Sequence, residues 1–334
     1  AYEIRLSLVG SEMCIRDSHI SLFAQQTNLI TSIEKRTTTS LNGQWEILID
    51  PYENGFYNYR YQEHENGFFK NEKPKTKQDL IEYDFVSSDY LNVPGDWNSQ
   101  REKLELYEGT VWYKKSFQYT KQGNKRQFIY IGAANYYAHV YINGKKIGEH
   151  EGGFTPFNFE ITTLLKTGEN FIVIKVDNKR RADGVPTLNT DWYNYGGLTR
   201  DIYLVETNET FIQDFTVQLK KGSLNTAFAS VTIDKPTSKS ITVLIPELKI
   251  NKTITLKGSQ TGKIEFPIKA QLWSPSNPKL YNVSIVLDKD TLKDKIGFRS
   301  IETKGEDILL NGKSIFLKGI CIHCLLYTSP SPRD

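Results

Sequence analysis

The sequence predicts an all-β protein of two domains. From Trp45 onward, short runs rich in β-branched and aromatic residues alternate with Gly, Asn, Asp and Pro turns, which is the pattern of successive strands. Helical periodicity is almost absent. Aromatic residues make up 12% of the chain, as suits β-rich structure and sugar-facing surfaces alike. The 334 residues allow for about two domains.

The first domain contains the clearest strand signals. Four runs read as strands: 128–133, 137–142, 171–177 and 201–207. Asn143–Gly144 predicts a hairpin, because a type I′ turn needs positive φ at both central residues. Residues 52–85 are charged and rich in Tyr, Asn and Gly, so we interpret them as a loop excursion.

A second stretch, residues 209–303, repeats the strand pattern more weakly. About one strand per dozen residues is the spacing of a seven-strand sandwich. The short polar segment near 207–210 marks the expected boundary between the two domains.

The end of the second stretch leads into a different pattern. Residues 308–323 contain another Asn–Gly turn, at Asn311–Gly312, and a near-continuous apolar run from Gly319 to Ile322 that ends at His323. Continuous apolarity is typical of a parallel strand buried on both faces. Such a strand needs neighbours and covering helices, so we expect it to open a further domain.

Composition excludes several classes of protein. The formal net charge is +3 with both signs interspersed, and no cluster of basic residues predicts nucleic-acid binding. No apolar run approaches the ~18 residues of a membrane span. Residues 19–26 fit the end of a signal peptide, so we expect a periplasmic or secreted protein. The five histidines show no metal-ligand spacing, so no metal site is predicted from spacing.

The two ends of the chain read as artefacts. Residues 10–17 and 324–334 back-translate, over their overlap, into opposite strands of one oligonucleotide that resembles a sequencing-library adapter. We therefore expect residues 1–17 and 324–334 to lie outside the natural protein. The single methionine, Met13, falls in the first of these segments, so we expect the remainder to be an internal fragment.

Several blocks, in order and at matching spacing, resemble glycoside hydrolase family 2 of the β-galactosidase/β-glucuronidase type. They cover nearly all of residues 38–323. The blocks are LNGQWEILID (41–50), VPGDWN (93–98), YEGTVWYKKSF (107–117), VYINGKKIGEHEGGFTPFNFEIT (140–162), TDWYNYGGLTRDIYLVET (190–207), LWSPSNPKLY (272–281), IGFRSIE (296–302) and LLNGKSIFLKGICIH (309–323).

The resemblance implies a fold and an activity. It implies a jelly-roll-like sugar-binding sandwich at 38–207, an immunoglobulin-like sandwich at 208–303, and the first strand of a (β/α)8 catalytic barrel at 304–323. Residues 18–37, ahead of the first block, are expected to be a leader or the end of a signal peptide. The family hydrolyses β-glycosidic bonds with retention by means of two glutamates. Both lie on later barrel strands, so we expect no catalytic residue in this chain and no activity from it alone. The expected substrate of the parent protein is a terminal β-linked galactoside or glucuronide of an oligosaccharide.

Four residues are candidates for substrate binding. The resemblance assigns Asp191 and His323 to sugar contacts, and a polar residue at the position of Asp96 contacts sugar in some relatives. Trp192 could wall the sugar cleft. Each has a structural alternative: Asp191 as an Asx-turn residue, His323 and Trp192 as packing residues, and Asp96 as a residue without contact to sugar.

The remaining expectations concern function class and partners. The alternative to a glycosidase fragment is a non-catalytic carbohydrate-binding protein. Residues 308–323 favour the enzyme, because a binding module has no use for a buried parallel strand. Some members of the family bind Mg or Na near the active site, and many form homo-oligomers, so the intact parent could do both.

Overall fold

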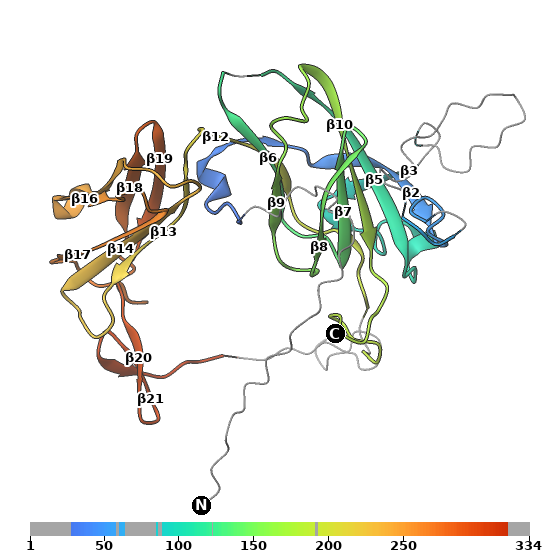
Figure 1. Ribbon diagram of the computed structural model, residues 1–334. Coiled ribbons are helices and arrows are strands. Elements are labelled where there is room, and N and C mark those ends of the chain that lie inside the picture. The colour runs from blue at the N-terminus through green and yellow to red at the C-terminus, as the bar shows by residue number, and fades with distance from the viewer. Residues whose placement is uncertain are drawn as a thin grey trace, which may run out of the picture.

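The computed structural model describes residues 28–57, 60–63, 85, 89–121, 123–190 and 193–319. In these residues the regular structure consists of β-strands and three short 3-10 turns (Figure 1), as predicted. The 3-10 turns are η1 (Ile33–Lys35), η3 (Glu102–Leu104) and η4 (Pro246–Leu248). The strands are β1 (Thr37–Ser40), β2 (Gly43–Asp50), β3 (Asp89–Val93), β4 (Gly95–Asp96), β5 (Thr110–Tyr119), β6 (Arg126–Ile131), β7 (Tyr137–Ile142), β8 (Lys145–Glu151), β9 (Phe157–Glu160), β10 (Gly168–Asp177), β11 (Gly197–Leu198), β12 (Ile202–Thr207), β13 (Ile212–Leu219), β14 (Thr226–Ile233), β15 (Ser240–Ile245), β16 (Ile250–Thr255), β17 (Thr261–Pro267), β18 (Tyr281–Leu287), β19 (Asp290–Ile296), β20 (Ile301–Lys304), β21 (Asp307–Leu310) and β22 (Lys313–Ile315).

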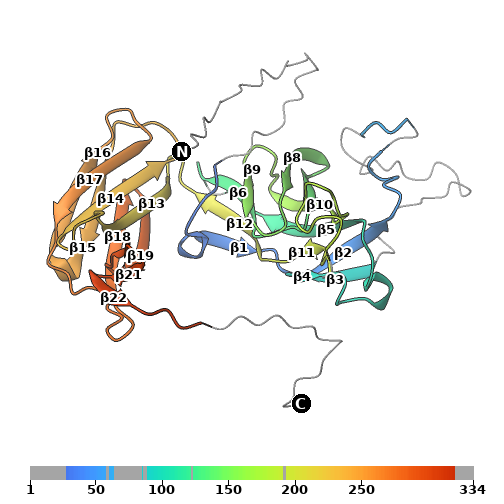
Figure 2. The same cartoon turned by 90° about the horizontal axis from the view of Figure 1, so that it is seen from below.

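The first sandwich packs a four-stranded sheet against a six-stranded sheet (Figures 1 and 2). Their strand orders are β1-β12-β6-β9 and β3-β2-β5-β10-β7-β8. In β10 the side chains of Ile172, Ile174 and Val176 belong to the core between the sheets. Alternate residues of a strand point to opposite faces, so Val173 and Lys175 lie on the outer face. Both are buried as well, so this sheet is covered on both sides.

The second sandwich contains the seven strands expected from the sequence. A three-stranded sheet (β13-β14-β17) packs against a four-stranded sheet (β16-β15-β18-β19). Along β14 buried and half-buried residues alternate strictly, as in a strand with one face in the core. The buried side chains are Ala227, Ala229, Val231 and Ile233.

Both predicted Asn–Gly hairpins are confirmed. Asn143 and Gly144 have φ of 50° and 82° between β7 and β8, and Asn311 and Gly312 have φ of 52° and 77° between β21 and β22. The second hairpin belongs to a separate antiparallel sheet, β20-β21-β22. Of the predicted parallel strand Gly319–Ile322, only Gly319 is among the described residues.

An N-terminal segment, residues 28–36, lies between the two sandwiches (Figure 1). It falls within residues 18–37, the predicted leader or end of a signal peptide. Ile30 and Ile33 are buried in one cluster with Phe128, Val205 and Phe211, which come from the first sandwich and from the join. The backbone N–H of Ile30 donates to Asn158 Oδ1 in β9 at 2.8 Å, and the Thr31 hydroxyl donates to the carbonyl of Gln213 in β13 at 2.9 Å. The segment therefore bonds to both sandwiches at once.

The outer face of the six-stranded sheet carries an ion cluster. Lys175 Nζ lies 2.7 Å from Glu53 Oε1, and Lys179 Nζ lies 2.9 Å from Glu53 Oε2. The ring of Phe56 covers the Lys175 ammonium at 4.1 Å from its centroid. Partial burial acts to raise the pKa of Glu53, but the two lysines outweigh it and lower that pKa to about 2. Glu53 thus compensates a lysine side chain that is only 3% exposed.

Replacing Glu53 with Gln should destabilise the fold in a pH-dependent way. The pKa of Glu53 lies near 2, below its ordinary 4.5, so its charge stabilises the fold above about pH 4.5 and this contribution is lost as the pH falls toward 2. At neutral pH we expect E53Q to lower the free energy of unfolding by about 2 kcal/mol, because a buried ammonium loses its partner. Urea denaturation should show that the difference in free energy of unfolding between wild type and E53Q becomes smaller as the pH falls from about 5 to about 2.5.

The matched control is Glu265→Gln. It breaks a pair of similar length, Lys220–Glu265 at 2.7 Å, whose side chains are about half exposed. Exposed pairs contribute little, so this variant should change the free energy of unfolding by less than about 0.5 kcal/mol. If the difference in free energy of unfolding between E53Q and wild type did not depend on pH, the stabilising role of the Glu53 charge would be contradicted.

Candidate functional site

Two of the four expected substrate-binding residues, Asp191 and Trp192, belong to the connection between β10 and β11, residues 178–196. Asp191, Trp192 and His323 lie outside the described residues. Asp96 is described and ends β4, which pairs with β11 through Asp96 and Gly197. We call residues 178–196 the Asp191 loop. The structure brings Asp96 beside the C-terminal end of this loop, and the sugar contacts of Asp191, Trp192 and His323 stay predictions.

The carboxylate of Asp96 takes part in a local turn. Oδ1 accepts a hydrogen bond from the Ser99 backbone N–H at 2.7 Å, and Oδ2 accepts one from the Ser99 hydroxyl at 2.9 Å. This is an Asx-type turn that stabilises the chain after β4. The observed contacts give Asp96 a structural role, while its contact with sugar stays a prediction.

Two asparagines form the base of the Asp191 loop. Asn178 follows β10 directly, and its Nδ2 donates to the carbonyl of Asn194 at 2.7 Å. The Asn194 side chain in turn donates to the carbonyl of Asn178. Asn178 Oδ1 also accepts the backbone N–H of Gly109 at 2.8 Å. Asn178 is fully buried and Asn194 nearly so, so this reciprocal pair ties the exit of the loop to its entry.

Two further asparagines hold the residues after Asn194. Asn98 Oδ1 accepts the backbone N–H of Gly196 at 2.9 Å, while its Nδ2 donates to the carbonyl of Leu104 at 2.9 Å. Asn135 Nδ2 donates to the carbonyl of Tyr195. Sequence reasoning missed all four asparagines. The available signal was limited to Asn178, which directly follows the predicted strand 171–177, where a short amide side chain can bond to neighbouring backbone groups.

The glycine pair at 196–197 is required by close packing. A Cβ on Gly196 would lie 2.1 Å from Cζ2 of Trp97, a fully buried ring. Gly197 has φ of 136°, a conformation that L side chains rarely adopt. The chain can therefore pass over Trp97 and enter β11 only with glycine at both positions.

The entry side of the loop is held by an arginine. Arg180 donates from one terminal nitrogen to the carbonyl of Thr190 at 2.6 Å, and its Nε donates to Glu108 Oε1 at 2.8 Å. The guanidinium is 20% exposed. Thr190 directly precedes Asp191, so the residues on either side of the predicted sugar-binding pair, Thr190 and Asn194, both have fixed backbone positions.

A small hollow of about 220 Å³ opens beside this loop. Its lining includes an exposed tyrosine, Tyr193, whose ring stacks on that of Tyr195 at 5.5 Å and 25°. Eight residues line it: Asn98, Glu105, Leu106, Glu108, Arg180, Thr190, Tyr193 and Asn194. Aromatic faces beside carboxylates and amides are groups that can hold a polar, ring-shaped ligand.

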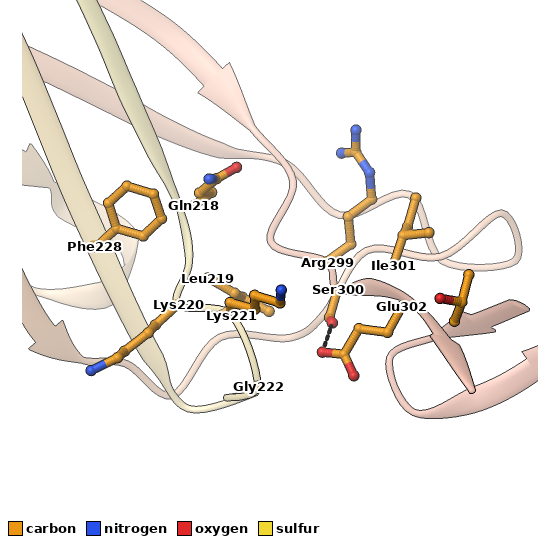
Figure 3. A pocket seen from close by; sticks show the side chains of 11 residues that line it. Gln218, Leu219, Lys220, Lys221, Gly222, Phe228, Arg299, Ser300, Ile301 and Glu302 are labelled. Atoms are coloured by element: carbon orange, nitrogen blue, oxygen red, sulfur yellow. Dashed lines mark hydrogen bonds between the residues drawn. The ribbon is translucent and has the colours of Figure 1, made fainter. Parts of the chain in front are cut away.

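A larger hollow, about 760 Å³, lies in the second sandwich (Figure 3). It opens between the β13–β14 connection and β20, and it contains none of the predicted substrate-binding residues. Its lining mixes the cations Lys220, Lys221 and Arg299 with the apolar side chains of Phe228 and Ile301. Arg299 is already engaged, with its guanidinium 5.2 Å from the centroid of the Trp273 ring. The larger volume of this hollow is therefore not by itself a reason to prefer it to the hollow beside the Asp191 loop as the functional site.

The described residues contain no group of three His, Cys, Asp or Glu side chains placed to hold a metal ion. They also contain no helix that is long and apolar enough to cross a membrane. One buried histidine, His139, lies between the rings of Phe56 and Tyr137. Burial, followed by the charges of nearby lysines and an arginine, lowers its pKa to about 2. His139 is thus neutral at physiological pH and acts as a packing residue.

Two family models match the chain in succession. The sugar-binding domain of glycosyl hydrolases family 2 matches residues 38–208, and a second model of glycosyl hydrolases family 2 matches residues 210–299. The chain belongs to glycoside hydrolase family 2. The resemblance of the sequence blocks to this family is thereby confirmed.

Relatives of the family 2 chain include enzymes of both expected types. A putative β-glucuronidase of Formosa agariphila is 31% identical over 254 residues, covering 70% of this chain and 31% of the relative. A β-galactosidase of Thermoanaerobacter pseudethanolicus is 29% identical over 277 residues, covering 75% and 37%. The β-glucuronidase of Bifidobacterium dentium, solved with coumarin-3-O-glucuronide, has the same fold, with a TM-score of 0.70 and 24% identity over 88% of this chain and 53% of that one. The chain spans about a third to a half of these proteins.

Truncating Asn178 to Ala should loosen the base of the loop. The substitution leaves the buried N–H of Gly109 and the carbonyl of Asn194 without their partner. An unsatisfied buried group costs about 1–3 kcal/mol, so we expect the free energy of unfolding to fall by about 3 kcal/mol and amide exchange at Gly109 to accelerate. The control is Asn225→Ala in an exposed turn. Unchanged exchange at Gly109 would contradict the role of Asn178.

Proposed function

We propose that this chain is the carbohydrate-recognising N-terminal part of a retaining β-glycosidase that releases terminal β-linked sugars from oligosaccharides. The observation that carries the proposal is the succession of the two family 2 domains along one chain. Relatives named as β-glucuronidases and β-galactosidases support the reaction class. A galactoside or a glucuronide is the proposed substrate.

The chemistry divides between this chain and the barrel that we propose to follow it. Retention requires two carboxyl groups about 5–5.5 Å apart, one as nucleophile and one as acid and then base. In this proposal both are barrel glutamates beyond His323. The chain itself contributes binding: Asp191 accepts hydrogen bonds from sugar hydroxyls, Trp192 walls the cleft, and His323 donates from the end of the first barrel strand.

Three further features belong to the same proposal. The mature protein is periplasmic or secreted, in line with residues 19–26. The intact parent assembles as a homo-oligomer. The intact parent would bind a Mg or Na ion near the active site, with Asp191 as a candidate ligand, and no step of the reaction is assigned to this ion.

The test compares this chain with the same chain continued by the downstream sequence of its gene. The extended protein should hydrolyse 4-nitrophenyl β-galactoside or β-glucuronide, and NMR of the first-formed sugar should show the β-anomer. In the extended protein Asp191→Asn should lower kcat/KM by about 100-fold, because a hydrogen-bonded charge on the sugar contributes about 2–3 kcal/mol. The shorter chain should release no product.

The control variant in the extended protein is Asp288→Asn, which alters an exposed ion pair of the second sandwich and should leave kcat/KM unchanged. Inhibitor-sensitive turnover by the shorter chain would refute the placement of both glutamates beyond it. An extended protein that binds sugars and hydrolyses no aryl β-glycoside would favour the carbohydrate-binding alternative.

A further inference from the structure

We infer that the hollow beside the Asp191 loop is a subsite for one uncharged sugar unit of the oligosaccharide. This inference rests on the proposed function, which supplies the oligosaccharide ligand. The described lining residues are the basis for the number and the charge of the sugar units bound. Asp191 and Trp192 lie outside the described residues, and the inference uses neither of them.

The size of the hollow fits a single ring. Pockets that enclose drug-sized ligands measure about 300–1,000 Å³, and this hollow measures about 220 Å³. Its described lining residues come from two regions far apart in the chain: Asn98, Glu105, Leu106 and Glu108 from one, and Arg180, Thr190, Tyr193 and Asn194 from the other. A loop excursion alone would not keep such a shape, but here Asn98 bonds to Leu104 and to Gly196 and so joins the two regions.

We call Tyr193 and Leu106, two members of the lining, its apolar wall. Tyr193 is 39% exposed, and its ring is stacked on Tyr195. Leu106 is 78% exposed. The stacking restricts rotation of the Tyr193 ring before any ligand arrives, so little entropy is lost on binding. The C–H face of a pyranose ring can lie against this wall.

The polar wall favours a sugar without charge. Its described lining residues present the carboxylates of Glu105 and Glu108 and the guanidinium of Arg180, so among these residues acidic groups outnumber basic groups by two to one. Arg180 already donates to Glu108 and to the carbonyl of Thr190. Hydroxyl groups can donate to the carboxylates, whereas the carboxylate of a uronic acid would meet like charge. The hollow therefore selects against a uronate, whichever terminal sugar the enzyme removes.

Binding of two matched probes to the full chain tests the inference. The probes are methyl β-D-galactopyranoside and methyl β-D-glucuronide, titrated by NMR at neutral pH and low salt. We expect millimolar binding of the neutral probe and binding of the glucuronide that is weaker by roughly fivefold or more. The glucuronide should gain roughly threefold in affinity in Glu105→Gln, because one of the repelling charges is removed.

Variants of the apolar wall complete the test. Tyr193→Ala should weaken binding of the neutral probe by roughly five- to tenfold, and Leu106→Ser, at a position too exposed to affect folding, should weaken it in the same direction. The control is Tyr52→Ala, which removes a tyrosine that is 82% exposed and lies outside the lining. Three results would overturn the inference. They are an affinity for the neutral probe that is equal in wild type and both wall variants, tighter binding of the glucuronide than of the neutral probe, and no binding of either probe at about 50 mM.

The outcome separates this inference from the proposed function. An extended protein that hydrolyses aryl β-glycosides while the chain fails these titrations leaves the glycosidase intact and removes the subsite. Binding with the expected variant pattern in a protein without hydrolytic activity keeps the subsite and removes the glycosidase.

Discussion

The rest of the structure depends on one strand that is buried on both faces. β10 lies near the middle of the six-stranded sheet, between β5 and β7. Its core side is apolar, but its outer side carries Lys175, and an ammonium cannot be buried without compensation. Glu53 supplies that charge from the segment after β2. Because the outer face is closed in this way, β10 is fixed along its length, and so is the point at which the chain leaves it to form the Asp191 loop.

The strands and hairpins could be predicted from the sequence because their causes are local. Period-two alternation and the positive φ of Asn143–Gly144 each depend on a few neighbouring residues. The four asparagines under the loop could not be predicted in the same way. Asn98 bonds to Gly196 and Asn178 to Gly109, pairs that are adjacent only after the sheets have formed. Asp96 was a candidate by resemblance, and only the fold shows that Ser99 uses both of its oxygens.

The join between the sandwiches shows a second limit of sequence reasoning. An apolar segment near an N-terminus has the same composition whether it is a leader or part of a core. Ile30 and Ile33 are shown to belong to a core only by their packing with Phe128 and Phe211. Arg126 strengthens the same join, since its guanidinium pairs with Glu160 in the first sandwich and with Asp234 in the second. The N-terminal segment, its apolar cluster and Arg126 all join the two sandwiches. Two domains joined in this way move as one unit more readily than two domains joined by a linker alone.

This rigidity bears on the binding role that we propose for the chain. A binding group contributes to catalysis only if it is held within about 0.5 Å of its productive position. Here the constraint is passed along the chain: Glu53 fixes β10, β10 places Asn178, and Asn178 fixes Asn194. Arg180 fixes Thr190 from the other side. The described ends of the Asp191 loop therefore take their positions from the sandwich, so the binding energy of a ligand is not needed to order these two points.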